Sequence, residues 1–404
     1  MKRYILLSVG LALTALACQQ ATPPAVACVA APTQAGVTVN TPISVASGFK
    51  EIAAEDIAAV EPNRLLTDPT GLDLNSLIAS NCNDGLLRRV TVQPAAVPSG
   101  GARPQSFSKV YIQTEDIPLE QVISAGDVDL DYGDLDFAKA QSMQLQSGVQ
   151  VQAATGTLDF TNQVLTLGPA SVAFKGQLLS TLQPKFRLKF SNGSVERFEL
   201  GLSGSLGVNL EARVSATAAV DNTKELEVAK FEFKRVFLIG AVPVVIVITP
   251  RLVVGYAMAV TGDVSVTAKA TPTLNMGYGM KYVRTANPKW STSPTAPSIT
   301  FNPIFNYTNQ VTGTAGVYAK LLVGVKLYGV AGPDLEALSE IKLELKSSGN
   351  PLAKLTFGSS ATGSLAGGFK VLGLDLNVNL GSLNVFKQTK GFSCANASTC
   401  TALP

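Results

Sequence analysis

The sequence contains no histidine among its 404 residues, and only 15% of them are charged. Without imidazole, the chain cannot form a Ser-His-Asp triad or an HExxH zinc site. The charged fraction lies below the roughly 25% of an ordinary soluble protein. The formal net charge of +3 falls to +1 once Lys2 and Arg3 are set aside. No nucleic-acid partner is therefore expected.

Other signals of catalysis are missing as well. The chain has no phosphate-binding GxxxxGK[ST] loop and no GxGxxG dinucleotide fingerprint. Glycoside hydrolysis needs only two carboxylates, but no pair of acidic residues stands out in the sequence. We therefore expect a non-enzymatic protein without an organic cofactor.

No apolar run is long enough for a membrane-spanning helix, which needs about 20 residues. The longest run near the start, residues 4–16, follows the basic residues Lys2 and Arg3. A basic start, a short apolar stretch and small residues before a cleavage site are typical of an export signal. We expect residues 1–17 to be this signal peptide.

Ala15-Leu16-Ala17 precedes Cys18 and resembles the lipobox of bacterial lipoproteins. The resemblance implies that Cys18 is lipidated and becomes the new N-terminus, so that the protein is anchored in the cell envelope on a bacterial membrane. Ordinary secretion is the alternative, because Ala15-x-Ala17 is also a cleavage signal. Residues 18–35 are rich in Ala, Pro, Gln and Thr, which predicts a lipidated tether.

The chain has five cysteines, and lipidation of Cys18 leaves four that can pair. Export places them in an oxidising compartment, where disulfides persist. Four cysteines allow three connectivities. Nearest-neighbour pairing favours Cys28–Cys82 and Cys394–Cys400. The second bond would close residues 393–404 into a tail.

Residues 36–92 are mixed in pattern, with helical spacing over 50–60 and a second short helix expected over 72–78. We expect a small mixed α/β region here. The Pro- and Gly-rich segment 93–106 predicts a linker or long loop and is the expected domain boundary.

From about residue 107 the apolar period changes to two, which indicates β structure. The longest alternation covers 198–220, and it returns over 252–270, 311–327 and 372–380. Residues 237–248 are apolar at every position, as in a strand buried on both faces.

Two further segments complete this pattern. Residues 334–346 fit either a helix or a strand, while Ser191-Asn192-Gly193 and Asp221-Asn222 have turn chemistry. The fold class expected is mainly β, with long antiparallel strands over 107–392 forming an elongated sandwich, tube or open barrel. VPVVIVITP (242–250) and LYGVAGPDLE (327–336) resemble stretches of uncharacterised, β-rich secreted bacterial proteins.

One acidic run offers the only candidate metal site, with Asp127, Asp129 and Asp131 at alternate positions and Asp134 close behind. Calcium prefers several carboxylate oxygens at close range, so this run is a calcium candidate. The sixth and twelfth positions of an EF-hand loop are occupied by Tyr132 and Ala138, which do not fit. The alternative is an edge strand with Val128, Leu130 and Tyr132 facing inward.

Residues 284–310 interrupt the alternation and contain the single tryptophan of the chain. A long loop rich in aromatic residues is a common place for a binding site. The candidate binding residues are Trp290, Phe301, Phe305 and Tyr307. The alternative is that these aromatics cap one end of the β core.

Together these features predict a cell-envelope lipoprotein that acts as a structural or surface-binding β module. Its expected partners are a membrane, through the lipid anchor, and an envelope protein or an apolar ligand. The first alternative is a carrier that holds a lipid or other apolar ligand inside a β tube. The second is an outer-membrane β-barrel component, because alternation is also the signature of such barrels.

Overall fold

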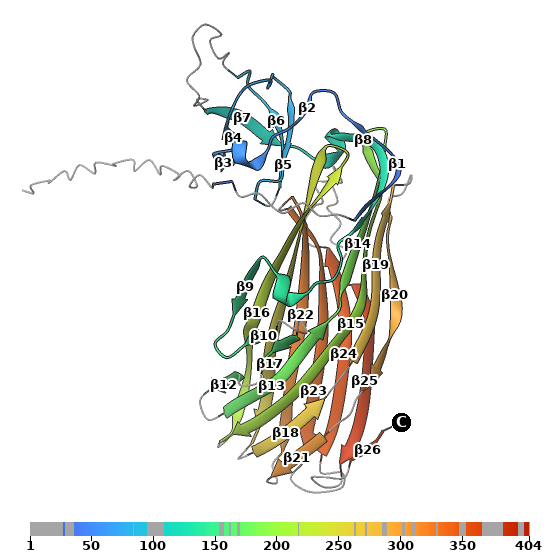
Figure 1. Cartoon of the computed structure of the whole chain (residues 1–404). Coiled ribbons are helices and arrows are strands. Elements are labelled where there is room, and N and C mark those ends of the chain that lie inside the picture. Colours follow the sequence, from blue (N-terminus) through green and yellow to red (C-terminus); the bar gives the residue numbers. More distant parts are fainter. Residues whose placement is uncertain are drawn as a thin grey trace, which may run out of the picture.

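The computed structural model consists almost entirely of β-strands, arranged in two large sheets and one small sheet (Figure 1). It describes residues 27–28, 36–83, 85–94, 109–152, 157–160, 163–167, 170–216, 218–261, 264–270, 273–284, 289–300, 304–308, 312–328, 330–346, 353–365, 383–394 and 400–403. The expected signal peptide, most of the tether and the 372–380 alternation lie outside these residues. The mainly β fold class is confirmed.

The first large sheet, sheet 1, has twelve described strands, and all its pairings are antiparallel. They are β1 (Val37–Val45), β8 (Ile123–Asp131), β10 (Gln150–Gln152), β11 (Thr157–Asp159), β12 (Gln163–Leu167), β13 (Ala170–Ser180), β14 (Gln183–Ser191), β15 (Ser194–Ala216), β18 (Val264–Ala270), β19 (Thr273–Val283), β20 (Lys289–Thr300) and β21 (Ile304–Thr308).

The second large sheet, sheet 2, is also antiparallel and faces sheet 1 along the long body of the molecule (Figure 1). Its described strands are β9 (Ser142–Leu145), β16 (Val220–Ile239), β17 (Val242–Val260), β22 (Gly313–Leu327), β23 (Val330–Leu345), β24 (Ala353–Leu365), β25 (Leu383–Cys394) and β26 (Cys400–Ala402).

β15 runs for 23 residues, so most of the 198–220 alternation is one unusually long strand, but the strand ends at Ala216 and Val220 already belongs to β16 of sheet 2. One side of β15 pairs with β13 and then β14, and the other side with β18 and then β19. The chain passes from β13 to β14 beside Gly204, whose φ is 137°. A Cβ at Gly204 would collide with the carbonyl oxygen of Thr181, so only glycine permits this close crossing.

The inward faces of the two large sheets form one apolar core. Tyr132, which follows β8, joins the sheets in the upper half: its hydroxyl donates to the carbonyl of Phe233 at 2.6 Å. The Tyr132 ring centre lies 6.0 Å from that of Phe237 and 6.3 Å from that of Phe186. This part of the sandwich is therefore closed by direct packing.

The segment 237–248, expected to be one strand buried on both faces, contains the turn between β16 and β17, and Leu238 is exposed. Only residues 242–248 of β17 are buried on both faces. Its even-numbered residues face the main core, whereas Val245 and Val247 form a separate outer cluster with Val236 of β16. Gly85 lies against Val245 and the Tyr328 ring, so the small sheet approaches sheet 2 here.

The small sheet contains β2 (Phe49–Glu51), β3 (Ala59–Glu61), β4 (Arg64–Thr67), β5 (Leu77–Ser80), β6 (Leu86–Val90) and β7 (Val110–Asp116). Only the β2–β5 pair is parallel in the part of the chain that the structure describes. One face of β5 and β6 forms a core of its own, while Leu77, Ala79 and Leu87 join the main core. The small sheet thus caps one end of the sandwich (Figure 1).

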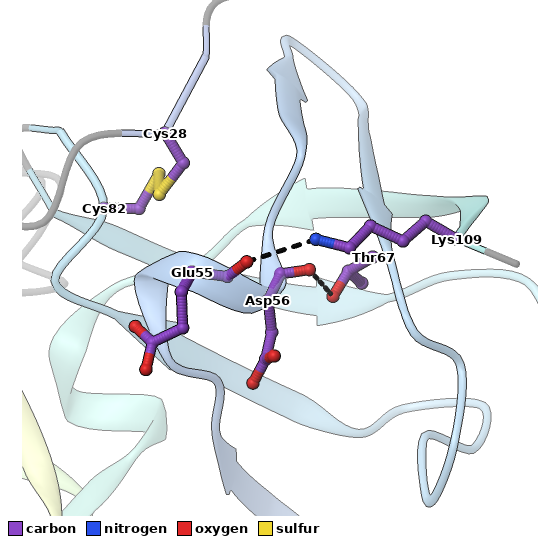
Figure 2. Close-up of a disulfide and its surroundings, with 6 residues drawn as sticks. All are labelled: Cys28, Glu55, Asp56, Thr67, Cys82 and Lys109. Atoms are coloured by element: carbon purple, nitrogen blue, oxygen red, sulfur yellow. Dashed lines mark hydrogen bonds between the residues drawn. A yellow bond between two sulfur atoms is a disulfide. The ribbon is translucent and has the colours of Figure 1, made fainter. Parts of the chain in front are cut away.

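The Cys28–Cys82 disulfide is present, with the two Cα atoms 5.2 Å apart (Figure 2). It attaches Cys28, within the expected tether of residues 18–35, to the loop after β5. Beside it, the carbonyls of Glu55 and Asp56 accept hydrogen bonds from the side chains of Lys109 and Thr67. The disulfide therefore lies in a part of the small sheet that side-chain hydrogen bonds to the backbone also stabilise.

The two helices expected over 50–60 and 72–78 are not formed. Residues 54–56 form a single 3₁₀ turn, η1 (Ala54–Asp56), between β2 and β3, and residues 72–78 lead into β5. Further short turns are η2 (Leu119–Gln121) and η3 (Phe137–Lys139). Short helices have only marginal stability on their own. Here the backbone N–H and C=O groups of these segments form hydrogen bonds in strand pairing instead.

The boundary expected at 93–106 falls inside the small sheet. β6 precedes this segment and β7 follows it, and the two strands pair with each other. β1, by contrast, belongs to sheet 1 although it precedes the small sheet in the chain. The small module therefore runs from Phe49 to Asp116 and is a β module, not the mixed α/β region of residues 36–92.

The loop expected over 284–310 is largely strand. β20 pairs with β19 and β21 pairs with β18. Pro294 and Pro297 are typical of a loop, yet both lie in β20. Among the described strands β20 pairs only with β19, so it is an edge strand, where proline is tolerated. Ala296 and Pro297 of β20 together oppose the single residue Met276 of β19, so this proline lies in a bulge.

Two smaller expectations are also resolved. Asn192 and Gly193 form the β14–β15 turn with positive φ values of 51° and 64°, as their turn chemistry predicts. Asp221 and Asn222 instead lie inside β16, where they pair with β17. Residues 334–346 form a strand, most of β23, with Leu335, Ile341 and Leu343 buried.

Candidate functional site

A groove of about 540 Å³ lies on the outer face of sheet 2. Five strands, β16, β17, β22, β23 and β24, supply its lining. The lining residues are Lys230, Glu232, Thr249, Arg251, Leu322, Val323, Gly324, Val325, Lys326, Asp334, Leu335, Glu336 and Thr362. Alternation places the polar lining residues on the outer face, because the residues next to them in each strand face the core, among them Val323, Val325 and Leu335 of the lining.

Strand register places the charged residues of the groove in an ordered way. Arg251 of β17 pairs with Leu322 of β22, which pairs with Glu336 of β23. Lys230 lies beside Arg251 on β16. Two strand spacings separate β17 from β23, or about 10 Å. One side of the groove therefore carries Lys230, Glu232 and Arg251, the other carries Asp334 and Glu336, and Lys326 of β22 lies between them.

Gly324 forms the floor between these two sides. It pairs with Thr249 on one side and Asp334 on the other. A Cβ on Gly324 would lie 2.9 Å from the Oδ1 atom of Asp334, so a larger residue would fill the space in front of that carboxyl group. The absence of a side chain is what leaves the groove open at its centre.

The environment of Asp334 shifts the pKa of its carboxyl group upward. The protein around it removes part of its hydration and raises the pKa of the carboxyl group, while Arg251 and Lys326 act against this rise. Arg251 itself lies 3.6 Å from a carboxylate oxygen of Glu227. The groove thus combines acceptor and donor groups suited to a polar or charged surface of a partner.

The acidic run forms part of β8, which lies between β1 and β14 and is therefore not an edge strand. Val128, Leu130 and Tyr132 do face the core, as expected. Register places the aspartates opposite basic residues of β14. Arg187 donates two hydrogen bonds to Asp127, at 3.1 and 2.8 Å, and lies 3.7 Å from Asp129.

The other members of the run also have partners. Asn40 of β1 donates to Asp129 at 2.8 Å, and Gln183 donates to Asp134 at 2.6 Å. Asp131 caps the backbone N–H of Gly133 and lies 3.9 Å from the Lys185 ammonium. No group of three or more acidic or cysteine side chains in the described residues is placed to hold a metal ion. The calcium site stays a prediction without geometric support.

The aromatic candidates are dispersed over two strands. Trp290 lies on β20, and Phe305 and Tyr307 lie on β21. Phe301 and the side chains of the other three lie outside the described residues, so their role as a binding set stays a prediction.

The C-terminal cysteines fall on neighbouring strands. Cys394 is buried and disulfide-bonded, and Cys400 is opposite it in the β25–β26 ladder. This register supports the expected Cys394–Cys400 pair. The side chain of Cys400 lies outside the description.

Sequence reasoning missed the groove because its residues are spread over more than 130 positions of the chain. The polar residues of each strand were visible, but only register brings them together. It also missed Tyr256, which is fully buried and whose hydroxyl has no hydrogen-bond partner. The alternation of the sequence correctly places Tyr256 on the inward face. It does not indicate whether the hydroxyl group has a hydrogen-bond partner.

Comparison with protein-family models, with curated proteins and with solved structures finds no match for this chain. No helix in the described part of the chain has the length and hydropathy of a membrane span.

Proposed function

We propose that this protein is a non-enzymatic lipoprotein of the bacterial cell envelope that acts as a tethered, surface-binding β module. Three features support the proposal. Cys18 follows a lipobox-type signal, the Cys28–Cys82 disulfide fixes the expected tether to the small sheet, and this sheet caps a long sandwich that would project from the anchor.

The observation that carries the binding role is the groove on sheet 2. Rigid strands place its charged groups, and neighbouring strands hold each of them in register. A site built on paired strands loses little conformational entropy when a partner binds. We therefore assign the groove, and not the sandwich interior, as the contact surface for an envelope component.

Site-specific photocrosslinking tests this assignment. Leu322 at the centre of the groove is replaced by a photoreactive phenylalanine analogue, and intact envelopes are irradiated. The matched control carries the same analogue at Lys342, an exposed position on β23 outside the groove. A discrete adduct at position 322 and none at 342 is the expected result. No adduct at 322, or equal adducts at both positions, would remove the groove from the proposal.

The carrier alternative has one specific observation in its favour, the unpartnered hydroxyl of Tyr256 inside the sandwich.

A further inference from the structure

Tyr256 differs from the other deeply buried tyrosines of the sandwich. Tyr132 donates its hydroxyl to the carbonyl of Phe233, and Tyr328 donates to the carbonyl of Pro243. Tyr256 is equally buried, yet its hydroxyl has no hydrogen-bond partner among the described residues. A buried polar group left without a hydrogen bond costs about 1–3 kcal/mol. Such a cost points to a hydrogen-bonding partner that the described residues do not supply.

The surroundings of Tyr256 are apolar on the inward face. Val254 and Met258 flank it on β17, and Val317 is its cross-strand neighbour on β22. All three belong to the main core. A molecule reaching the Tyr256 hydroxyl must therefore carry an apolar portion that can lie against these side chains.

The opposite neighbour of Tyr256 is charged. Lys224 of β16 pairs with Tyr256 in register, so both residues lie on the inward side of sheet 2. β9 pairs with β16 only at residues 229–232, which leaves β16 as the outermost described strand of its sheet at Lys224. Lys224 is half-buried and thus marks the rim of the interior.

We propose that the inward face around Tyr256 and Lys224 binds a single-chain amphiphile with an anionic headgroup, of the long-chain fatty acid class. The headgroup carboxylate accepts a hydrogen bond from the Tyr256 hydroxyl and lies near the ammonium group of Lys224. The acyl chain lies against Val254, Met258 and Val317. This inference rests on the carrier alternative and is independent of the groove.

The titration of Tyr256 is consistent with this role. Burial raises the pKa of the hydroxyl, so it stays protonated and remains a donor throughout the physiological range. A neutral donor next to a cationic rim favours an acceptor that is itself negatively charged.

Calorimetric titration of the full mature chain with sodium dodecanoate tests the inference. Dodecyltrimethylammonium bromide, with the same chain length but a cationic headgroup that accepts no hydrogen bond, is the control ligand. Wild-type protein is expected to bind dodecanoate more tightly than the ammonium compound. Tyr256→Phe should weaken dodecanoate binding about tenfold, equal to about 1.4 kcal/mol, and leave the control ligand unaffected.

The melting temperatures of Tyr132→Phe and Tyr256→Phe separate an effect on ligand binding from an effect on folding. Tyr132→Phe removes a hydroxyl that has a partner, so it should lower the melting temperature without changing dodecanoate affinity. Tyr256→Phe should not lower the melting temperature of the ligand-free protein, because it removes an unsatisfied group. Lys224→Gln, at a half-buried position, should also weaken dodecanoate binding.

Absence of dodecanoate binding to wild-type protein would overturn the inference, as would equal dodecanoate affinities of wild type and Tyr256→Phe. Neither result affects the crosslinking test of the groove, so the interior and surface proposals fail independently.

Discussion

At the scale of single residues, the acidic run shows how buried charge is stabilised in this fold. Asp127 is 6% exposed and receives two hydrogen bonds from Arg187. These bonds are the main reason that the pKa of Asp127 lies below its usual range, with a smaller contribution from Asn40. The run therefore has a structural role in joining β8 to β14.

Replacing Asp127→Asn is expected to lower the free energy of unfolding by about 2 kcal/mol at neutral pH, because a charge-assisted pair is lost. A carboxyl group with a lowered pKa contributes its full stability above the unfolded value of about 3.9 and loses it as the pH falls further. The difference between wild type and variant should therefore shrink below about pH 4. Urea denaturation at several pH values measures this, and Glu55→Gln controls for removal of one exposed charge at neutral pH. A difference that stays constant down to the lowest pH would contradict the account.

Arg88 holds the small sheet together in a similar way. It is 5% exposed and donates to the Glu61 carbonyl at 2.7 Å, to the Thr114 hydroxyl at 3.1 Å and to Asp116 at 3.0 Å. Burial lowers the pKa of its guanidinium group, and Asp116 opposes that change. Arg88 of β6 therefore links β3 and β7 through two buried acceptors and the exposed carboxylate of Asp116.

Arg88→Ala leaves two buried acceptors without a donor and should destabilise the protein by about 3 kcal/mol. Arg89→Ala is the matched control, since Arg89 pairs with a half-exposed Glu115 at the neighbouring position. Chemical denaturation followed by far-UV circular dichroism distinguishes the two variants. Equal effects of the two substitutions would show that burial of Arg88 is not what matters.

At the scale of elements, the sequence was most informative where one face of a strand is buried. Alternation identified β15, β17 and β22, because inward residues such as Phe198 and Leu321 must be apolar. It failed over residues 50–60, where an apparent helical spacing is divided between β2, η1 and β3. The local spacing of apolar residues does not show which distant strands will form backbone hydrogen bonds with such a segment.

The same limit explains the candidate site. The lining of the groove comes from five strands, and its centre depends on the register between Gly324 and Asp334. Register over such separations follows from the packing of both large sheets. The Cys28–Cys82 pair was easier to predict, because it follows from the number and order of the cysteines. Lipidation of Cys18 stays a prediction.

The outer edge of β20 yields a prediction of its own. Exposed edge strands can pair with other chains, and proline reduces this risk because it lacks a backbone donor. The double variant Pro294→Thr/Pro297→Thr restores two donors on an edge strand of sheet 1. We expect increased self-association, measured by size-exclusion chromatography with light scattering. An unchanged monomer fraction at high concentration would mean that these prolines do not protect the edge.

At the scale of the whole molecule, the chain combines a predicted anchor with a long sandwich capped by a small sheet. Leu77, Ala79 and Leu87 of the cap share the core of the sandwich, so the two parts pack as one body. Cys28, within the expected tether, is fixed to this cap through its bond with Cys82. The anchor would therefore hold the capped end nearest the membrane.

The central claim is that the mature protein begins at a lipidated Cys18. Protein extracted from membranes is reduced and digested with trypsin, and the N-terminal peptide, residues 18–50, is analysed by mass spectrometry. We predict a peptide that starts at Cys18 and carries the added mass of acyl chains, since firm anchoring needs two or more of them. A mature chain that starts at another residue, or one that starts at an unmodified Cys18, would contradict the account.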